Sequence, residues 1–186
     1  MPPLRTESPF SLQVVGGLVA GDSLLIGGII YAARDAAHKR LTEMIEKGKP
    51  LPVELDGHTV YYMGPSPTPP GKVIGSCGPT TSRRMDAYTP ALLQKGLLVM
   101  IGKGERSEPV KKAIQKHGAV YLVATGGIGA LLANCVKKAE PAAFEDLGPE
   151  AILRLEVENF PAIVAYDNRG GDLFQREIAR YALDRE

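Results

Sequence analysis

Two kinds of hydrophobic pattern alternate along the chain. Continuous apolar runs, which are typical of buried strands, occur at residues 22–33, 97–102 and 119–125. Between residues 34 and 49 the apolar positions recur at helical spacing instead, and Gly48 ends this pattern. The predicted helix face consists of Ala36, Ala37, Leu41, Met44 and Ile45. The alternation predicts an α/β fold.

The part of the chain after residue 71 repeats strand and helix patterns in turn. Strands are predicted at residues 72–78, 97–102 and 119–125, and helices at residues 82–95, 107–117 and 127–138. Ser107 is a suitable N-cap for the second of these helices, and Gly118 is a suitable stop at its end. Units of this kind stack into a parallel sheet with right-handed connections.

Three further patterns lie outside these units. Residues 53–63 carry Asp56-Gly57 between two β-prone runs, which predicts a hairpin. A pair of strand patterns follows at residues 152–159 and 161–168, and a charged helix pattern follows at residues 172–186. The sheet is therefore predicted to be only partly parallel.

Segment 65–71 contains four prolines in seven residues, which is typical of a stiff connector. It separates a strand-rich part, residues 1–64, from the βα part, residues 72–186. A chain of 186 residues is long enough to bury a core without help, so we interpret the two parts as one domain.

Composition and charge exclude several classes of protein. Hydrophobic residues make up 44% of the chain and charged residues 23%, with a formal net charge of +1. This balance excludes a disordered tail protein and argues against a nucleic-acid binder, which needs a surplus of basic charge. Every apolar run is far shorter than the roughly 20 residues of a membrane span, and residues 1–10 lack a signal or transit pattern, so we expect a cytoplasmic protein without membrane contact.

The two cysteines, Cys77 and Cys135, are too few for a disulfide framework. Neither has the CxxC or Cys/His spacing that is typical of zinc, and we predict no metal site in this chain. We expect both to be small buried side chains.

The most informative segment is GSCGPTTSRRMD, residues 75–86, between a predicted strand and a predicted helix. Its hydroxyl groups belong to Thr80, Thr81 and Ser82. Glycines, hydroxyl groups and the free N–H groups of a helix start favour a bound anion, and Arg83 or Arg84 can add a forked contact to a carboxylate or phosphate. The alternative is that a hydroxyl group only caps the helix and both arginines are solvated.

Two more cationic motifs follow predicted strands. Lys103 lies between two glycines after the strand at 97–102, and it is either a turn lysine or part of the same anion crevice, since adjacent parallel strands bring their carboxyl ends together. It is not a Walker motif, because Glu105 stands where a Ser or Thr would be needed. Arg34 and Asp35 open the first long helix, and His38 lies about one turn further on.

A fourth motif, TGGIG at residues 125–129, follows a predicted strand and opens a helix, like part of a dinucleotide fingerprint. The match is weak, because Leu132 occupies the place of the third glycine. Tight packing of the helix on the sheet is the favoured explanation for these glycines.

Taken together, the segments RDAAHKR, GPTTSRRMD and GKG, in this order, resemble the β subunit, or C-terminal domain, of class I iron–sulfur fumarate hydratases. The β subunit of L-tartrate dehydratase is similar too, although the RDAAHKR and RRMD forms look more like the fumarases. The resemblance covers nearly the whole chain and implies a swivelling β/β/α domain. It also implies a hydro-lyase that hydrates fumarate to L-malate.

The resemblance implies a role for each motif. Arg34, Arg84 and Lys103 would bind the substrate carboxylates, and Thr80 would be the general base for the carbon-bound proton. Fixed cations suit a dicarboxylate, because the transition state carries still more charge on oxygen. The motif residues with an expected supporting role are Asp35, His38 and Thr81.

Enzymes of this family use a [4Fe–4S] cluster, which needs at least three protein thiolates, whereas this chain has two cysteines. The resemblance therefore implies that a separate α subunit holds the cluster and that the working form is an α/β hetero-oligomer. A homodimer is the form expected for the isolated chain. Two other hypotheses stay open, a nucleotide-binding domain that uses the TGGIG turn and a scaffold without catalytic groups.

Overall fold

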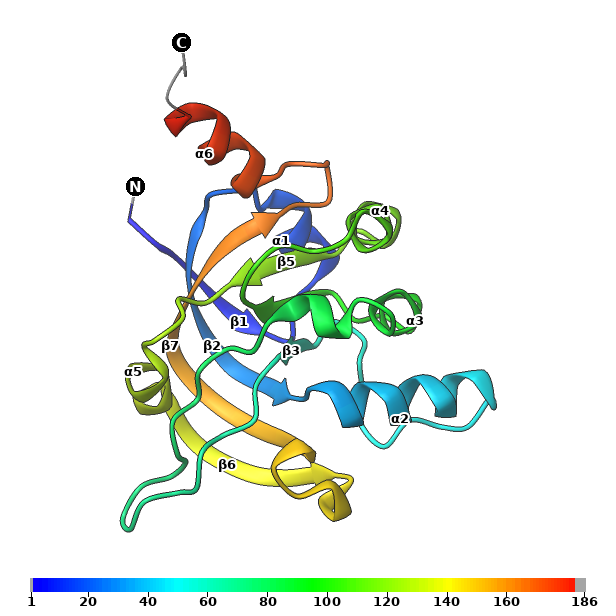
Figure 1. The fold of residues 1–186 in the computed structure, drawn as a ribbon, viewed down its shortest axis with the longest axis vertical. Helices are drawn as coiled ribbons and strands as arrows, with labels where there is room; N and C mark the ends of the chain where they lie inside the picture. The colour runs from blue at the N-terminus through cyan, green and yellow to red at the C-terminus, as the bar shows by residue number, and fades with distance from the viewer. Residues whose placement is uncertain (1, 183–186) are drawn as a thin grey trace.

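Strands from both ends of the chain join in one mixed sheet in the computed structural model, which describes residues 2–182 (Figure 1). Within these residues the strands are β1 (Leu4–Ser8), β2 (Ser23–Ala32), β3 (Thr59–Tyr61), β4 (Val99–Gly102), β5 (Val120–Val123), β6 (Val136–Ala143) and β7 (Ile152–Tyr166). Their order is β1-β2-β3-β4-β5-β7-β6, and β7 also pairs with β2. The sheet thus closes as a small barrel of β2, β3, β4, β5 and β7.

Strand direction decides where the ends of the strands lie. Parallel pairing links β2 to β3, β3 to β4 and β4 to β5, whereas β7 runs antiparallel to β5 and β2. Four consecutive strands therefore bring their carboxyl ends to the same end of the barrel. The pairing of β7 with β2 shifts between Ile26 and Gly28, opposite Asn159 with its φ of 52°, and such a bulge increases the bend of the strand.

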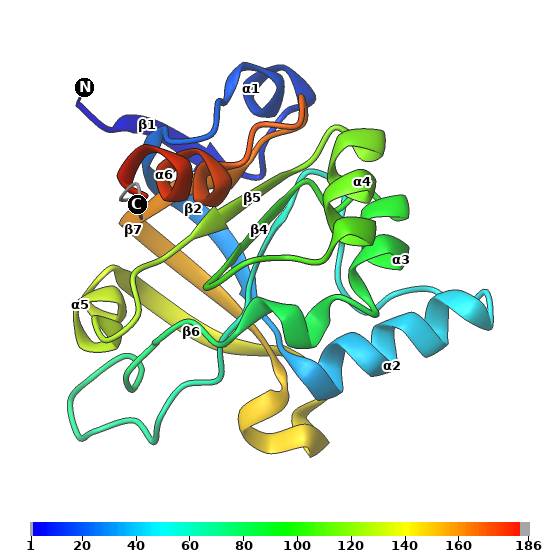
Figure 2. The same ribbon diagram turned by 45° about the horizontal axis from the view of Figure 1, so that its top comes forward.

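Helices cover the barrel unevenly. They are α1 (Leu12–Gly17), α2 (Asp35–Glu46), α3 (Thr89–Gln94), α4 (Glu108–His117), α5 (Gly129–Asn134) and α6 (Leu173–Tyr181), with 3₁₀ helices at Ser82–Met85 and Glu145–Glu150. The row of α2, α3 and α4 lies on one flank of the barrel, and α5 and α6 lie apart from it (Figure 2). Across residues 2–182, no helix combines the length and apolar character that a membrane crossing requires.

Two hydrophobic cores share the central strands. Val99 and Ile101 of β4 join Leu122 of β5 in the core of the barrel, whereas Met100 joins the core between the barrel and the helices. All four side chains are fully buried. Burial on both faces explains why these strands have continuous apolar sequences rather than alternating ones.

The predicted arrangement of a partly parallel sheet flanked by helices is confirmed. The apolar runs at 22–33, 97–102 and 119–125 contain β2, β4 and β5. The helix patterns that begin at residues 34, 107 and 172 contain α2, α4 and α6. Gly118 ends α4 in the left-handed region, with φ of 66°, which a glycine adopts at little cost.

Two strand predictions were wrong. Residues 72–78 form no strand, because β3 already occupies the place beside β4. The hairpin at residues 53–63 is absent, because Asp56 pairs with Leu97 in an isolated antiparallel bridge and only β3 forms. In both cases pairing between distant segments overrides local β propensity.

Three element boundaries were also wrong. The helix predicted at 82–95 is divided into the 3₁₀ helix Ser82–Met85 and α3. The helix predicted at 127–138 ends at Asn134, since β6 begins at Val136 and pairs with β7. The paired strand patterns at residues 152–168 form the single strand β7. The last four residues of the predicted C-terminal helix lie outside the described residues.

The proline-rich connector belongs to an irregular loop between β3 and the first 3₁₀ helix. Two hydrogen bonds close the base of this loop, from Ser66 N to Ser76 O at 3.1 Å and from Ser76 N to Ser66 Oγ at 2.8 Å. Because β3 and β4 pair directly on either side of the connector, both parts of the chain contribute strands to one barrel.

Candidate active site

Most of the predicted site residues lie at the carboxyl ends of the parallel strands. Arg34 follows β2, and Lys103 follows β4. Thr80 belongs to the segment that crosses this end of the barrel, and its N–H donates to the Tyr62 carbonyl, just after β3, at 2.8 Å. Ligands in sheets with parallel strands commonly bind at this end.

The arginine segment, residues 80–86, lies directly against the lysine segment, residues 102–107. Thr81 and Lys103 form an isolated parallel bridge. Ser82 N donates to the Lys103 carbonyl at 3.0 Å, and Lys103 N donates to Ser82 Oγ at 3.0 Å. The two segments are therefore adjacent, as the sequence predicted. The predicted reason was wrong, because a bridge between loops joins them and residues 72–78 form no strand.

Asp35 joins two of the predicted cations. Its Oδ2 accepts from Arg34 Nε at 3.1 Å, and its Oδ1 accepts from Arg84 Nε at 2.8 Å. Arg34 Nη2 also lies 3.3 Å from Glu150 Oε1, and Glu150 Oε2 accepts from Ala36 N at 2.8 Å. Glu150, which the sequence analysis missed, thus caps the start of α2 and holds Arg34; its place 114 residues from Ala36 gave no local signal.

The charges around Asp35 keep it ionised. Burial alone would raise the pKa of its carboxyl group, but hydrogen bonds from its own backbone N–H and from Arg34, with the positive charge of Arg84, outweigh burial and lower that pKa. Within residues 2–182, Arg84 pairs only with Asp35 and Lys103 forms no ion pair. Both side chains are exposed, so the Arg84 Nη atoms and the Lys103 ammonium group can receive an anion.

The His38 side chain contacts the backbone of Arg34 at the start of α2. Its side chain is fully buried, and Nδ1 lies 3.0 Å from the Arg34 carbonyl oxygen, which can only accept. Nδ1 therefore carries the proton, and Nε2 has no hydrogen-bond partner among residues 2–182. The His38 ring meets the Tyr62 ring edge-on at 5.2 Å. Burial lowers the pKa of His38 to about 4, so the imidazole is neutral at pH 7.

Packing accounts for one glycine of the TGGIG turn, Gly129, and it packs against a loop rather than against the sheet as predicted. A Cβ on Gly129 would lie 2.4 Å from Ser76 Oγ and 2.7 Å from Gly78 N, and Gly129 O accepts from Cys77 N at 3.0 Å. The helix that follows, α5, has only six residues. A side chain at position 129 would therefore collide with the loop that precedes Thr80.

The cysteines do not fit an iron–sulfur cluster. Cys77 is fully buried, its thiol donates to the Gly75 carbonyl, and burial raises its pKa to about 12. Cys135 is half-buried, at the end of α5, and burial raises its pKa too. Among residues 2–182, no group of three or more His, Cys, Asp and Glu side chains is arranged to hold a metal ion. A cluster needs thiolates, which these two sites disfavour.

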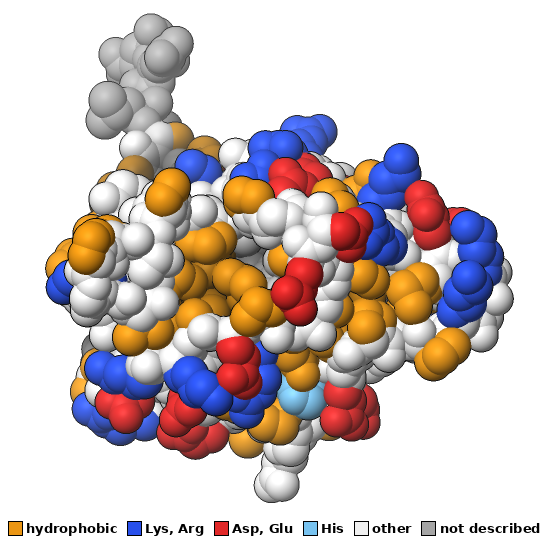
Figure 3. Space-filling model, turned by 90° about the horizontal axis from the view of Figure 1, so that it is seen from below, with side chains coloured by type: hydrophobic (Ala, Val, Ile, Leu, Met, Phe, Trp, Pro, Cys, Tyr) orange, Lys and Arg blue, Asp and Glu red, His pale blue; other side chains and the backbone are white. Residues whose placement is uncertain are grey.

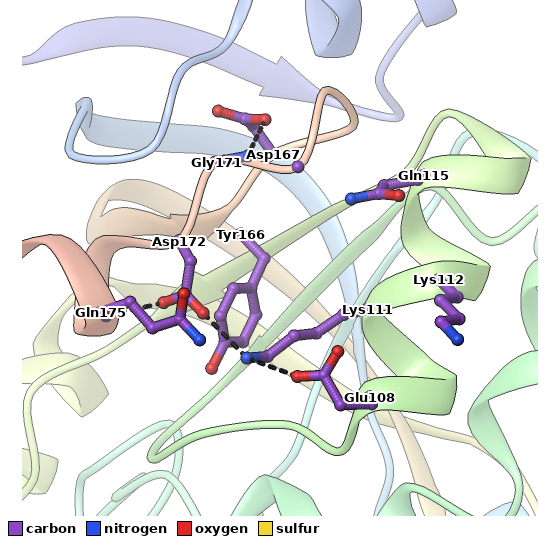
Figure 4. Close-up of a pocket in the computed structure, with 10 residues that line it drawn as sticks. Glu108, Lys111, Lys112, Gln115, Tyr166, Asp167, Gly171, Asp172 and Gln175 are labelled. Atoms are coloured by element: carbon purple, nitrogen blue, oxygen red, sulfur yellow. Dashed lines mark hydrogen bonds and ion pairs between the residues drawn. The ribbon is translucent and has the colours of Figure 1, made fainter.

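A cavity of about 250 Å³ lies away from these residues, between α4 and the connection from β7 to α6 (Figure 4). Most of its charged groups are already paired. Lys111 Nζ lies 2.8 Å from Asp172 and 3.1 Å from Glu108, and Asp167 accepts from Gly171 N at 2.8 Å. The Lys111–Asp172 ion pair joins α4 to the N-cap of α6. The cavity contains none of the predicted site residues.

Surface charge is mixed on the face that Figure 3 shows. Acidic and basic side chains are interspersed there, around a hollow where hydrophobic side chains reach the surface. This face carries no continuous basic band of the kind that nucleic-acid binders use.

Comparison with known proteins finds a family that matches most of the chain. The chain matches the family described as Fumarase C-terminus over residues 5–177. It is 45% identical over 175 residues to "Fumarate hydratase 1, mitochondrial" of Leishmania major, covering 93% of this chain and 32% of that protein. It is 45% identical over 157 residues to "Fumarate hydratase class I, anaerobic" of Escherichia coli, covering 83% and 29%.

A relative of similar size has a different description. "Putative L(+)-tartrate dehydratase subunit beta" of Methanocaldococcus jannaschii is 38% identical over 176 residues, covering 91% of this chain and 90% of that protein. The chain thus spans about a third of the length of the two fumarate hydratases and most of the length of the dehydratase subunit.

Proposed function

The chain belongs to the Fumarase C-terminus family, and from this premise we propose that it is the β subunit of a two-subunit hydro-lyase that interconverts fumarate and L-malate. In this proposal the chain supplies the cations that bind the dicarboxylate and a group that handles the carbon-bound proton. The observation that carries it is the meeting of the arginine and lysine segments at the Thr81–Lys103 bridge, where exposed cations lie at one end of the barrel.

Carboxylate binding follows from the ion pairs. Arg34 and Arg84 each give an Nε–H to Asp35, so the position of both guanidinium groups is fixed before substrate arrives. The Nη atoms of Arg84 and the ammonium group of Lys103 are then the donors for the substrate carboxylates. Cations held in place in this way stabilise the additional negative charge that develops on the substrate oxygens when the proton leaves carbon.

Thr80 is the proposed general base. Its backbone is held by the hydrogen bond to the Tyr62 carbonyl, and its neighbour Thr81 pairs with Lys103. An ordinary hydroxyl group is a poor base, and nearby positive charge is the influence that lowers its pKa and makes proton removal feasible. The Lys103 ammonium group is the candidate for that charge on this chain.

The cluster belongs, in this proposal, to a separate α subunit. Cys77 and Cys135 do not fit the thiolate requirement, and no step of the reaction is assigned to a group held by this chain's cysteines. The lengths agree, because the chain spans about a third of the fumarate hydratases and 90% of a relative described as a β subunit. The same relative makes tartrate dehydration the second candidate activity.

The test is co-expression with a three-cysteine partner subunit under anaerobic conditions, followed by assays with fumarate, malate and tartrate. We expect malate from fumarate, and a loss of about 100-fold in kcat/KM for Arg84→Ala and for Lys103→Ala, since each removes a charged contact to a carboxylate. Arg83→Ala, beside Arg84, and Lys95→Ala, which precedes β4 instead of following it, remove exposed charges and serve as controls.

Two outcomes would overturn the proposal. One is full turnover in both the Arg84 and Lys103 variants of the complex. The other is full hydration activity of the purified chain without a partner. Conversion of tartrate with no conversion of fumarate would select the second candidate activity and keep the binding residues.

A further inference from the structure

A buried ion pair joins the arginine segment to the lysine segment. Arg106 Nε donates to Asp86 Oδ1 at 2.7 Å, and Ser107 N donates to Asp86 Oδ2 at 2.7 Å. The Arg106 side chain is 0% exposed and that of Asp86 is 11% exposed. Asp86 lies two residues after Arg84, and Arg106 three residues after Lys103. The pair therefore joins the two segments that carry the proposed substrate cations.

Arg106 is held on every side of its guanidinium group. Nη2 donates to Thr89 Oγ1 at 2.7 Å, and Nη1 donates to the Tyr62 hydroxyl at 3.4 Å. The guanidinium carbon lies 5.3 Å from the centre of the Tyr62 ring and 5.0 Å from that of Tyr121. A planar group with directed donors and aromatic neighbours can adopt only one orientation here.

The two tyrosines extend this network to the backbone of the site. The Tyr62 carbonyl accepts the hydrogen bond from Thr80 N. The Tyr121 hydroxyl lies 2.8 Å from Ser82 Oγ and 2.9 Å from the Gly104 carbonyl oxygen. Ser82 Oγ in turn accepts from Lys103 N. The backbone of Thr80 and Lys103 is thus tied to the two tyrosines that flank Arg106.

Stability alone does not account for such an arrangement. Taking two charges out of water costs free energy, and hydrophobic side chains of the same volume are often equally stabilising or more so. What an ion pair adds is direction, because each donor must meet its acceptor at one distance and angle. The network therefore fixes geometry at the place where the two segments meet.

We propose that Asp86 and Arg106 are positioning residues, which set the arginine segment against the lysine segment so that their cations face one dicarboxylate. The assignment of those cations rests on the proposed function. The claim that the pair fixes the two segments concerns this chain alone, and it can be measured without any enzyme activity.

The first experiment measures amide hydrogen exchange in the isolated chain. One variant is Arg106→Lys, which keeps the positive charge but removes the planar guanidinium group and its directed donors. The other is Asp86→Asn/Arg106→Met, which removes both charges and keeps a similar side-chain volume. Exchange at Thr80, Ser82 and Lys103 is expected to quicken by about tenfold or more, while the β5 amides keep their rates. Lys111→Met/Asp172→Asn, at the ion pair between α4 and α6, is the matched control and should leave the three site amides unchanged.

An unchanged rate at these three amides in both variants would overturn the proposal. A uniform increase, equal at the site and in β5, would also overturn it, because that result indicates a general contribution to stability. If the double variant does not fold, Arg106→Lys alone decides the test, because it keeps a buried charge beside Asp86.

The second experiment uses the complex with the partner subunit. The double variant is expected to raise KM for the dicarboxylate by about tenfold and to lower kcat, with Arg106→Lys intermediate, since misplaced cations weaken both binding and transition-state contacts. A loss of folded complex with unchanged KM and kcat per folded site would contradict positioning. An inactive wild-type complex would overturn the proposed function, and the exchange rates would still decide the role of the pair.

Discussion

Asp35 Oδ1 accepts a hydrogen bond from Arg84 Nε at 2.8 Å, although 49 residues separate the two in the sequence. The same carboxylate holds Arg34 on its other oxygen. One negative charge thus keeps two guanidinium groups close to each other, which would otherwise repel. The positive charge of these two side chains is thus fixed in place and partly compensated by Asp35.

Replacing Asp35 tests this arrangement. Asp35→Asn is expected to lower the free energy of unfolding at pH 7 by about 1 kcal/mol, because it removes a charge-assisted hydrogen bond and an acidic group at the start of α2. The folded pKa of Asp35 is lowered, so its contribution is present at neutral pH and is lost as the pH falls below about 4 through the folded pKa. Urea unfolding at pH 7 and pH 3 measures both effects.

Glu46→Gln, at the exposed end of the same helix, is the control for this variant. It should leave the unfolding curves nearly unchanged at both pH values. Equal stability of Asp35→Asn and wild type at pH 7 would contradict the proposed role of the carboxylate.

His38 is expected to make the protein sensitive to mild acid. Its pKa is about 4 in the folded chain against the ordinary value of 6.5, because the buried ring resists protonation. The unfolded chain therefore binds more protons between these values, and the free energy of unfolding should fall by roughly 3 kcal/mol as the pH drops from 6.5 to 4. Urea unfolding across this range measures the slope.

His38→Asn keeps an N–H donor near the Arg34 carbonyl and removes the titrating group, so its slope over this pH range should be smaller than that of wild type. His117→Asn, at a partly exposed histidine in the last turn of α4, should keep the wild-type slope. A wild-type slope in His38→Asn would mean that other groups cause the acid sensitivity.

A substitution at Thr80 distinguishes a catalytic subunit from a scaffold without catalytic groups. Thr80→Val keeps the shape and removes the hydroxyl group, and kcat of the complex should fall by about 100-fold or more with little change in KM. Thr80→Ser should retain most of kcat. The measurement is kcat for malate dehydration, together with exchange of the carbon-bound hydrogen of malate in deuterated water.

The exposed Thr68 in the connector provides the matched control, Thr68→Val, which should behave as wild type. Wild-type kcat and hydrogen exchange in Thr80→Val would support the scaffold hypothesis and remove Thr80 from the mechanism.

The glycines of the TGGIG turn are expected to differ in their tolerance of alanine. Gly129→Ala places a Cβ 2.7 Å from Gly78 N and should lower the free energy of unfolding by about 1–3 kcal/mol. Gly126→Ala meets only Lys103 Cδ, at 3.8 Å, and should change it by less than about 0.5 kcal/mol. Thermal unfolding compares the two, and tight binding of NAD or ATP by the wild-type chain would instead favour a nucleotide site.

Sequence reasoning worked where local pattern and tertiary structure agree. The helical spacing from Ala36 to Ile45 is enough to define α2, which buries Ala37 and Leu41 fully and the other marked residues partly. The apolar run at 97–102 is enough to define β4, because all of its residues are buried. Residues 72–78 have the same β propensity, but β3 already occupies the place beside β4 where they would pair. Pairing partners are a property of the whole sheet, and a segment cannot reveal them.

The same limit applies to the site. The motifs around Arg34, Arg84 and Lys103 are contiguous in the sequence and could be found there, whereas Glu150 and Asp86 act on residues far along the chain. Arg106 shows the limit most clearly, because beside Glu105 it reads as one more exposed charge after a turn. Only its burial between two tyrosines reveals the interaction with Asp86. The sequence indicates the proposed substrate groups and Asp35, but not Glu150, Asp86 or Arg106.

The long strand β7 has a consequence for how the chain is made. It closes the barrel by pairing with β2 and β5, and it ends at Tyr166. During synthesis β2 and β5 therefore keep unpaired edges until residues 152–166 have left the ribosome, and such edges favour association with other chains. Contacts between segments so distant in sequence also favour slow folding. Chaperone demand in the cell should thus be concentrated in the interval before β7 emerges.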